Sequence, residues 1–227
     1  MAGAIGNFVS GSSGTDASSY TFTSVAAGGS GNAYVIVGIE HRPAGGVKTV
    51  STVTWNGHSL TRVGTERTSD SDGNGSFCCC SIWITSTPVP VGTSGDLVVT
   101  LSGTTLRCFH ELAVATGIDP AGFATAENGT GANPTSTTVN VPQDGILYAV
   151  AGNNSDVSAT WSGATESADA PVGAESNRAS TAFISGTAAE TGRTISVTWA
   201  ATGGDQALKV ATFSVGASPR SQAVVMG

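Results

Sequence analysis

Charged side chains are scarce in this sequence of 227 residues, where Asp, Glu, Lys and Arg make up 11% of the chain. Ordinary soluble domains carry about 25%. Nine basic residues stand against sixteen acidic ones, which gives a formal net charge of -7, and the basic residues form no cluster. Proteins that bind nucleic acid neutralise phosphates with clustered Lys and Arg. The sequence therefore predicts no nucleic-acid partner and, for the same reason, no anionic membrane partner.

Long apolar runs are also missing. The longest run, 33–39, is far shorter than the roughly 20 residues with which a helix crosses a bilayer. The first four residues, Met-Ala-Gly-Ala, have neither the charged nor the apolar part of a signal peptide. We therefore expect a soluble protein that is made in the cytoplasm of its host and is not exported.

No segment places its apolar residues at helical spacing. Short runs rich in β-branched and aromatic residues alternate instead with clusters of Gly, Asn, Asp and Pro, as in strands and turns. The sequence predicts an all-β protein, an antiparallel β-sandwich of jelly-roll type with about a dozen strands. The expected strands are 20–25, 33–41, 50–55, 60–66, 77–85, 97–101, 110–118, 137–141, 146–151, 157–161, 180–184, 194–199 and 207–215.

The two halves of this strand series match in order, which indicates an internal repeat. The matched pairs are VTWNG (53–57) with ATWSG (159–163), SIWI (81–84) with TAFI (181–184), LVVTL (97–101) with ISVTW (195–199), and LAVAT (112–116) with LKVAT (208–212).

The domain organisation is inferred from this repeat. The pseudo-repeats cover about 20–118 and 136–215, and the second is only about 80 residues long. We therefore expect both to share one β-sandwich domain over 19–216. An N-terminal arm over 1–18 and a C-terminal tail over 217–227 would flank it.

Three of the four cysteines are consecutive, at 78–80. Neighbouring side chains of a strand point to opposite faces, so three consecutive thiols do not converge on one tetrahedral ion. No Cys-X-X-Cys or Cys/His pair has zinc spacing, and we predict no metal and no cofactor. The repeat aligns the second and third cysteine with Ala179 and Ser180, so we interpret the cysteines as compact core fillers. A disulfide from Cys108 to one of the three is the alternative.

The strand that holds these cysteines is apolar on both faces, since Phe77 and Trp83 lie opposite Ile82 and Ile84. We expect it to be covered twice, once by its own sandwich and once by a crossing loop or another subunit. Phe77 and Trp83 are therefore the predicted interface residues.

One loop has the opening spacing of an EF-hand calcium loop. Asp70, Asp72 and Asn74 place oxygen ligands at alternate positions before Gly75. The twelfth position, however, is Ser81 rather than Glu, and strands flank the loop. These residues are a calcium candidate that lacks its closing ligand, and a polar hairpin tip is the alternative.

Catalytic motifs are missing. The sequence has no Gly-X-Ser-X-Gly motif, and its histidines have no obvious Ser or Cys partner. The pairs Glu40-His41 and His110-Glu111 could supply an acid or a base to a groove, but we interpret them as solvated positions on the outer faces of strands. The sequence therefore predicts no catalytic residue and no enzyme.

Two tryptophans, Trp55 and Trp161, each precede an Asn-Gly or Ser-Gly turn. They could stack on sugar rings at the surface. An equivalent aromatic in both repeats is, however, more typical of a core anchor.

Five segments carry a resemblance to a known group of proteins. They are TDASSYTFTSV, NAYVIVGIEHR, VSTVTWNGHSLTRVG, SIWITSTPVPVGTSGDLVVTLSG and RCFHELAVATGI. Their order resembles a loosely defined group of β-sandwich proteins from tailed bacteriophages, especially those of marine and other alphaproteobacterial hosts. The similarity covers about 15–215 and lies in strand order and turn dipeptides, with no catalytic motif to carry over.

The resemblance implies a virion structural protein. The expected function is that of a capsid decoration protein, which binds the major capsid protein or another virion protein and stabilises the capsid surface. A receptor- or glycan-binding module of a head or tail fibre is the alternative, and a polysaccharide-cleaving enzyme would need paired carboxylates in a groove. We expect a homo-oligomer, with a trimer favoured because decoration proteins often sit on local threefold axes. The two flanking arms would dock by strand addition or by clamping the partner's surface.

Overall fold

A computed structural model describes residues 2–43, 45–70, 73, 77–129, 131–173, 177–201 and 204–216. Over these residues the chain forms seventeen strands and no helix, and every strand pairing is antiparallel. The described part of the chain accordingly has no helix long and apolar enough to cross a membrane. The prediction of an all-β, antiparallel protein is confirmed.

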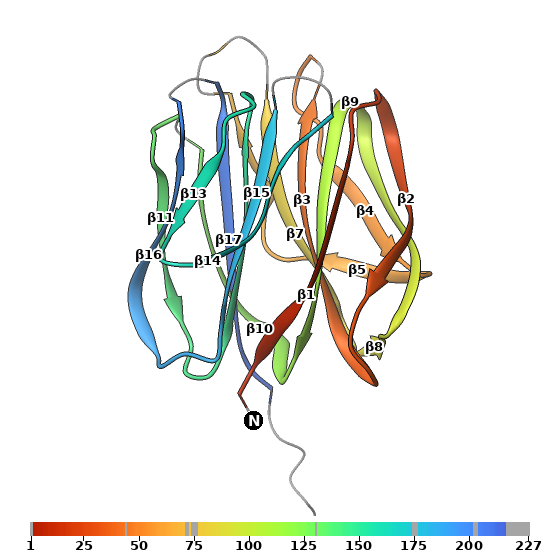
Figure 1. Cartoon of the computed structure of the whole chain (residues 1–227), viewed down its shortest axis with the longest axis vertical. Helices are drawn as coiled ribbons and strands as arrows, with labels where there is room; N and C mark the ends of the chain where they lie inside the picture. The colour runs from red at the N-terminus through yellow and green to blue at the C-terminus, as the bar shows by residue number, and fades with distance from the viewer. Residues whose placement is uncertain are drawn as a thin grey trace, which may run out of the picture.

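The strands divide into two halves that stand side by side in Figure 1. The first half contains β1 (Ala4–Ser13), β2 (Ala17–Ala27), β3 (Asn32–Pro43), β4 (Val50–Trp55), β5 (His58–Arg62), β6 (Arg67–Ser69), β7 (Cys78–Thr85), β8 (Val89–Pro90) and β9 (Thr93–Thr116). The second half contains β10 (Ile118–Asn128), β11 (Thr135–Val141), β12 (Ile146–Asn153), β13 (Ala159–Ser162), β14 (Thr165–Pro171), β15 (Arg178–Ser185), β16 (Glu190–Trp199) and β17 (Gln206–Val215).

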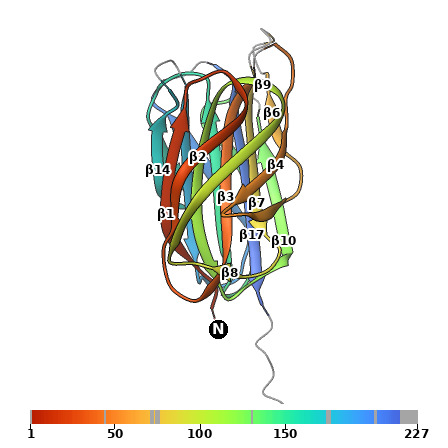
Figure 2. The same cartoon turned by 90° about the vertical axis from the view of Figure 1, so that its right-hand side faces the viewer.

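The first half closes into a barrel of five strands. β9 pairs with β4, β4 with β5, β5 with β7, β7 with β3, and β3 again with β9. The 24-residue β9 reaches both sides of this ring, because its beginning pairs with β2 and β4 and its end with β1 and β3. Figure 2 shows β9 running diagonally across this half.

A tight turn closes the opposite side of the ring. Asn56 and Gly57 join β4 to β5, and both have positive φ, at 47° and 78°. A two-residue hairpin turn with positive φ at both positions matches the twist of the flanking strands, and Asn-Gly is its preferred sequence.

The second half pairs its strands in a corresponding order but stays open. One sheet of the second half has the strand order β10-β17-β12-β15-β14. The corresponding order in the first half is β1, the end of β9, β3, β7 and β5. The other sheet has the strand order β11-β16-β13, and the corresponding order in the first half is β2, the beginning of β9 and β4. Among the described residues β13 and β14 belong to separate sheets. In each of the four matched sequence pairs, the strand of the first half and the strand of the second half occupy corresponding positions in their sheets.

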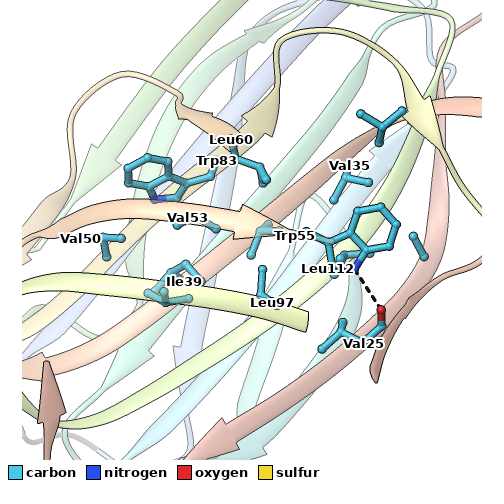
Figure 3. Packing of buried hydrophobic residues seen from close by; sticks show 14 of the residues in the cluster. Val25, Val35, Ile39, Val50, Val53, Trp55, Leu60, Trp83, Leu97 and Leu112 are labelled. Atoms are coloured by element: carbon cyan, nitrogen blue, oxygen red, sulfur yellow. Dashed lines mark hydrogen bonds between the residues drawn. The ribbon is translucent and has the colours of Figure 1, made fainter. Parts of the chain in front are cut away.

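Each half has its own core. Inside the barrel, Trp55 packs among residues such as Val35, Leu97 and Leu112, and its indole N–H donates to the backbone carbonyl of Val25 over 3.0 Å (Figure 3). A separate core fills the second half between its two sheets. The two halves therefore do not share a single sandwich, in contrast to the expectation from sequence.

A third core lies between the halves. It includes Ile36, Ile82 and Ile84 of the first half and Tyr148 and Phe213 of the second. Every residue of β7 and of β12 is buried, as expected for strands covered on both faces. The strand that was predicted to need a second cover is thus covered by the second half of the same chain, and not by a crossing loop or another subunit.

The predicted interface residues lie elsewhere than expected. Trp83 belongs to the core inside the barrel, where it is only 5% exposed, and Phe77 is a half-buried residue that precedes β7. Trp83 is therefore a core residue of the first half, because its side of β7 faces the barrel interior.

The expected N-terminal arm is largely a strand of the sheet. β1 pairs with the end of β9 from Ala4, opposite Thr116, to Ser13, opposite Cys108, and Ile5 is buried in the core between the halves. Small polar residues and a bulge between Gly6 and Val9 hide this strand in the sequence, since the bulge shifts the phase in which its residues alternate between more and less exposed. The expected C-terminal tail, 217–227, lies outside the described residues.

Candidate functional site

The two acid–histidine pairs of the sequence are buried. Glu40, His41, His110 and Glu111 are each at most 2% exposed, so their predicted position on solvated outer faces is wrong. The reason is that β3 and β9 lie inside the first half's sheet and are covered by the barrel interior on one side and by the second half on the other. Sequence alone does not reveal that second cover.

Glu40 lies at the joint between the halves. Its carboxylate accepts hydrogen bonds from the side-chain amide of Asn177 at 3.1 and 3.3 Å, and the thiol of Cys78 lies 3.7 Å from Oε1. Burial raises the pKa of Glu40 to about 7, although these two hydrogen bonds lower it in part. Because Asn177 belongs to the second half, the contact links the two halves through a buried acid.

Glu111 is the second buried acid of this joint. Its Oε1 lies 2.8 Å from the hydroxyl of Ser167 and 3.1 Å from that of Tyr148. Burial raises the pKa of this carboxyl as well. Gly38 makes room for the tyrosine, because a Cβ there would stand 2.8 Å from its hydroxyl oxygen. Both acids are thus sealed inside the molecule, where a polysaccharide does not reach them.

A second polar cluster lies at the end of the barrel where β3 ends and β7 begins. A ring nitrogen of His41, a carboxylate oxygen of Glu66 and the sulfur of Cys79 all lie within 4.8 Å of one another. Glu66 follows β5, and His41 and Cys79 are opposite residues in the β3–β7 ladder. Sequence spacing did not predict this group, because strand register brings the residues together.

The contacts of Glu66 hold this cluster in place. Its Oε1 lies 2.7 Å from Nε2 of His41, and its Oε2 accepts a hydrogen bond from the backbone N–H of Val50 over 2.9 Å. Arg62, whose side chain is 38% exposed, places Nη1 3.6 Å from Oε2. The cluster therefore lies one side chain beneath the surface.

All four cysteines are buried and have free thiols. Cys78 and Cys80 face the core between the halves, and Cys108 belongs to the core of the barrel. Cys79 points to the other face from its neighbours, where its sulfur lies 3.6 Å from the hydroxyl of Thr68. The interpretation as core fillers thus describes three of the thiols, whereas the fourth belongs to the polar cluster.

The remaining predicted sites are placed as follows. Of the calcium candidates, Asp70 is described, and Asp72 and Asn74 lie outside the described residues. Trp55 is fully buried, as a core anchor should be. Trp161 is half-buried and donates its indole N–H to Ser180 over 2.7 Å. Neither indole is an open platform for a sugar.

Among the hollows on the described surface are two of about 240 Å³ each. One lies beside Arg62, Ile84 and the exposed Phe123, where β10 passes β5 and β7. The other lies beside Ile5 and Val91. Sites for small molecules are usually larger, at roughly 300 to 1,000 Å³.

No family model matches this chain, and a search of curated proteins also finds no match.

Proposed function

We propose that the protein is a non-enzymatic structural protein of a bacteriophage virion, which binds the capsid surface and stabilises it as a decoration protein. Its partner would be the major capsid protein or another virion protein. The observation that carries the proposal is the strand order, which occurs twice in one chain and builds two halves packed face to face.

Each half is, in this proposal, a jelly roll, and the chain is a duplication of one such unit. A jelly roll arranges eight strands in two sheets of four. The first half has the corresponding order, with β1, the end of β9, β3 and β7 on one side and β2, the beginning of β9, β4 and β5 on the other. Jelly rolls are frequent in viral capsid proteins and also in lectins. The fold alone does not decide between these functions.

The chemistry of the chain favours docking over catalysis. The acid and histidine side chains that the sequence offered for catalysis are sealed inside the molecule. The two tryptophans that a glycan-binding module would use are buried or half-buried. The resemblance to phage β-sandwich proteins points the same way.

Capsid stabilisation would follow from linkage. A protein that binds only the assembled shell favours that shell by mass action, and the effect grows when several copies engage together. We propose a homo-oligomer, with a trimer as the expected form, whose subunits bind neighbouring capsid proteins.

Electron microscopy of labelled particles tests this function. Both ends of the described chain lie beside Gly117. The N–H of Gly216 donates to the carbonyl of Gly117 over 3.0 Å, and a Cβ added to Gly117 would stand 2.9 Å from the carbonyl oxygen of Ala2. A C-terminal epitope tag would therefore leave the sheets intact. We expect gold label over the capsids of phage that encode the tagged chain, and none on particles of a deletion strain. Label on the tail alone would favour the fibre module, and purified particles that lack the chain would overturn a virion role.

A further inference from the structure

We propose that His41, Glu66 and Cys79 bind a divalent transition-metal ion, with Zn²⁺ as the best match, at the end of the first-half barrel. Their ligand atoms already lie within 4.8 Å of one another. Zinc–ligand distances of about 2.0 to 2.3 Å place the ligands of a tetrahedral ion roughly 3.3 to 3.8 Å apart. Side-chain adjustments of about 1 Å are therefore enough to enclose the ion. The proposal does not depend on the virion role.

The hydrogen bonds of His41 decide which ring nitrogen would bind the ion. His41 is fully buried, its Nε2 lies 2.7 Å from Oε1 of Glu66, and its Nδ1 has no hydrogen-bond partner among the described residues. Nε2 is thus the nitrogen that faces Glu66, and an ion bound there takes the place of the hydrogen bond between the two side chains. The single proton of the neutral imidazole then lies on Nδ1.

The donor set selects the kind of ion. A thiolate, an imidazole and a carboxylate are the ligands of zinc, whereas calcium and magnesium prefer oxygen alone. The negative charges of thiolate and carboxylate balance the two positive charges of the ion. Three protein ligands leave a fourth position, which a water molecule or a nearby backbone carbonyl can take, and the carbonyl of Lys48 lies 4.0 Å from the sulfur of Cys79.

Binding would release a proton. A cysteine binds a metal ion as the thiolate, so the Cys79 thiol has to give up its proton when the ion binds. As the metal–sulfur bond forms, this proton leaves to solvent, and the affinity should rise with pH.

Cobalt is a suitable probe, because a thiolate bound to Co²⁺ gives a charge-transfer absorption band in the near ultraviolet. The full chain, treated with chelator and kept reduced, is titrated with Co²⁺ and then with Zn²⁺. We expect one Co²⁺ per chain, a charge-transfer band, and loss of that band as Zn²⁺ displaces the cobalt. No saturable band in the wild-type protein would overturn the proposal.

Two cysteine variants identify the ligand. Cys79→Ser should lose the charge-transfer band. The matched control is Cys80→Ser, since Cys80 is also a buried free thiol but lies in the core between the halves, where its sulfur is 3.6 Å from the carbonyl of Ala207. This control should keep the band. His41→Gln should weaken Co²⁺ binding at least about tenfold. A band that survives in Cys79→Ser would refute the assignment.

X-ray absorption on the zinc-loaded wild-type chain covers the case in which a variant does not fold. One sulfur at about 2.3 Å together with nitrogen or oxygen at about 2.0 Å would support the site. A shell of oxygen and nitrogen alone would rule it out.

Discussion

The two halves of the chain pair their strands in the same order, but over the residues that the structure describes the first closes into a barrel and the second does not. Two features of the first half accompany closure: the continuous β9, which belongs to both sides, and the Asn56-Gly57 hairpin. In the second half, residues 200–205 separate the corresponding strands β16 and β17. One strand order is thus compatible with a closed and an open cross-section. The polar clusters lie on the closed half or at its joint with the open one, so closure does not require an apolar interior throughout.

The matched tryptophans offer the largest test of this difference. Trp55 is fully buried in the closed half, and its counterpart Trp161 is half-buried in the open half. Trp55→Ala should lower the free energy of unfolding by roughly 3 to 5 kcal/mol. Trp161→Ala should cost only about 1 to 2 kcal/mol because less surface loses its contacts. Urea unfolding measures both, and equal losses would contradict the contrast between the halves.

The pH dependence of stability tests the joint between the halves. Glu40 has its pKa raised from 4.5 to about 7, so the folded chain favours the protonated acid. Its stabilising contribution is complete below pH 4.5 and is lost as the pH rises through 7, by roughly 3 kcal/mol in total. Urea unfolding of the wild-type chain and of Glu40→Gln between pH 5 and pH 8 isolates this contribution.

His110 has to be separated from this effect. Burial lowers its pKa to about 4, so its contribution is complete above pH 6.5 and is lost as the pH falls. It therefore acts in the opposite direction to Glu40 and remains in both proteins of the comparison. If Glu40→Gln and the wild-type chain keep a constant difference in stability from pH 5 to pH 8, the buried acid does not titrate as described.

The packing of the halves can be disturbed at one glycine. A Cβ at Gly152 would stand 2.5 Å from Cγ of Glu40 and 2.6 Å from the sulfur of Cys78. Gly152→Ala should therefore cost about 1 to 3 kcal/mol through overpacking. Gly6→Ala is the control, since nothing lies within 4 Å of a Cβ there. We expect one unfolding transition in both variants. Two separate transitions would mean that the halves fold independently of their joint.

The register of the strands explains what sequence comparison could and could not predict. Strand positions, the antiparallel all-β fold and the buried Trp55 followed from alternation and from turn residues. The structure adds a fifth match: YVIVG (34–38) and YAVAG (148–152) occupy the same place, because their tyrosines pair with the matched alanines Ala115 and Ala211.

The same register corrects the match between SIWI and TAFI. Ile36, two residues after the first tyrosine, pairs with Ile84, whereas Val150, two residues after the second, pairs with Thr181. Ile84 therefore corresponds to Thr181, three residues from its predicted counterpart. The cysteines consequently do not correspond to Ala179 and Ser180. Cross-strand neighbours such as His41 and Cys79 depend on this register. Every residue of β7 is buried, so this strand has no alternation of apolar and polar residues that would indicate its register.

The smallest expected effect concerns the turn that closes the ring. Gly57 has φ of 78°, and nothing lies within 4 Å of a Cβ there, so Gly57→Ala should cost only the backbone strain, about 1 kcal/mol. Gly192 in the open half has φ of 67° and the same open surroundings, and it serves as the matched control. Similar losses in urea unfolding would show that ring closure tolerates a strained turn, because the strand ladders of β9 hold the barrel. A loss of several kcal/mol at Gly57 alone would make the hairpin itself the element that keeps the first half closed.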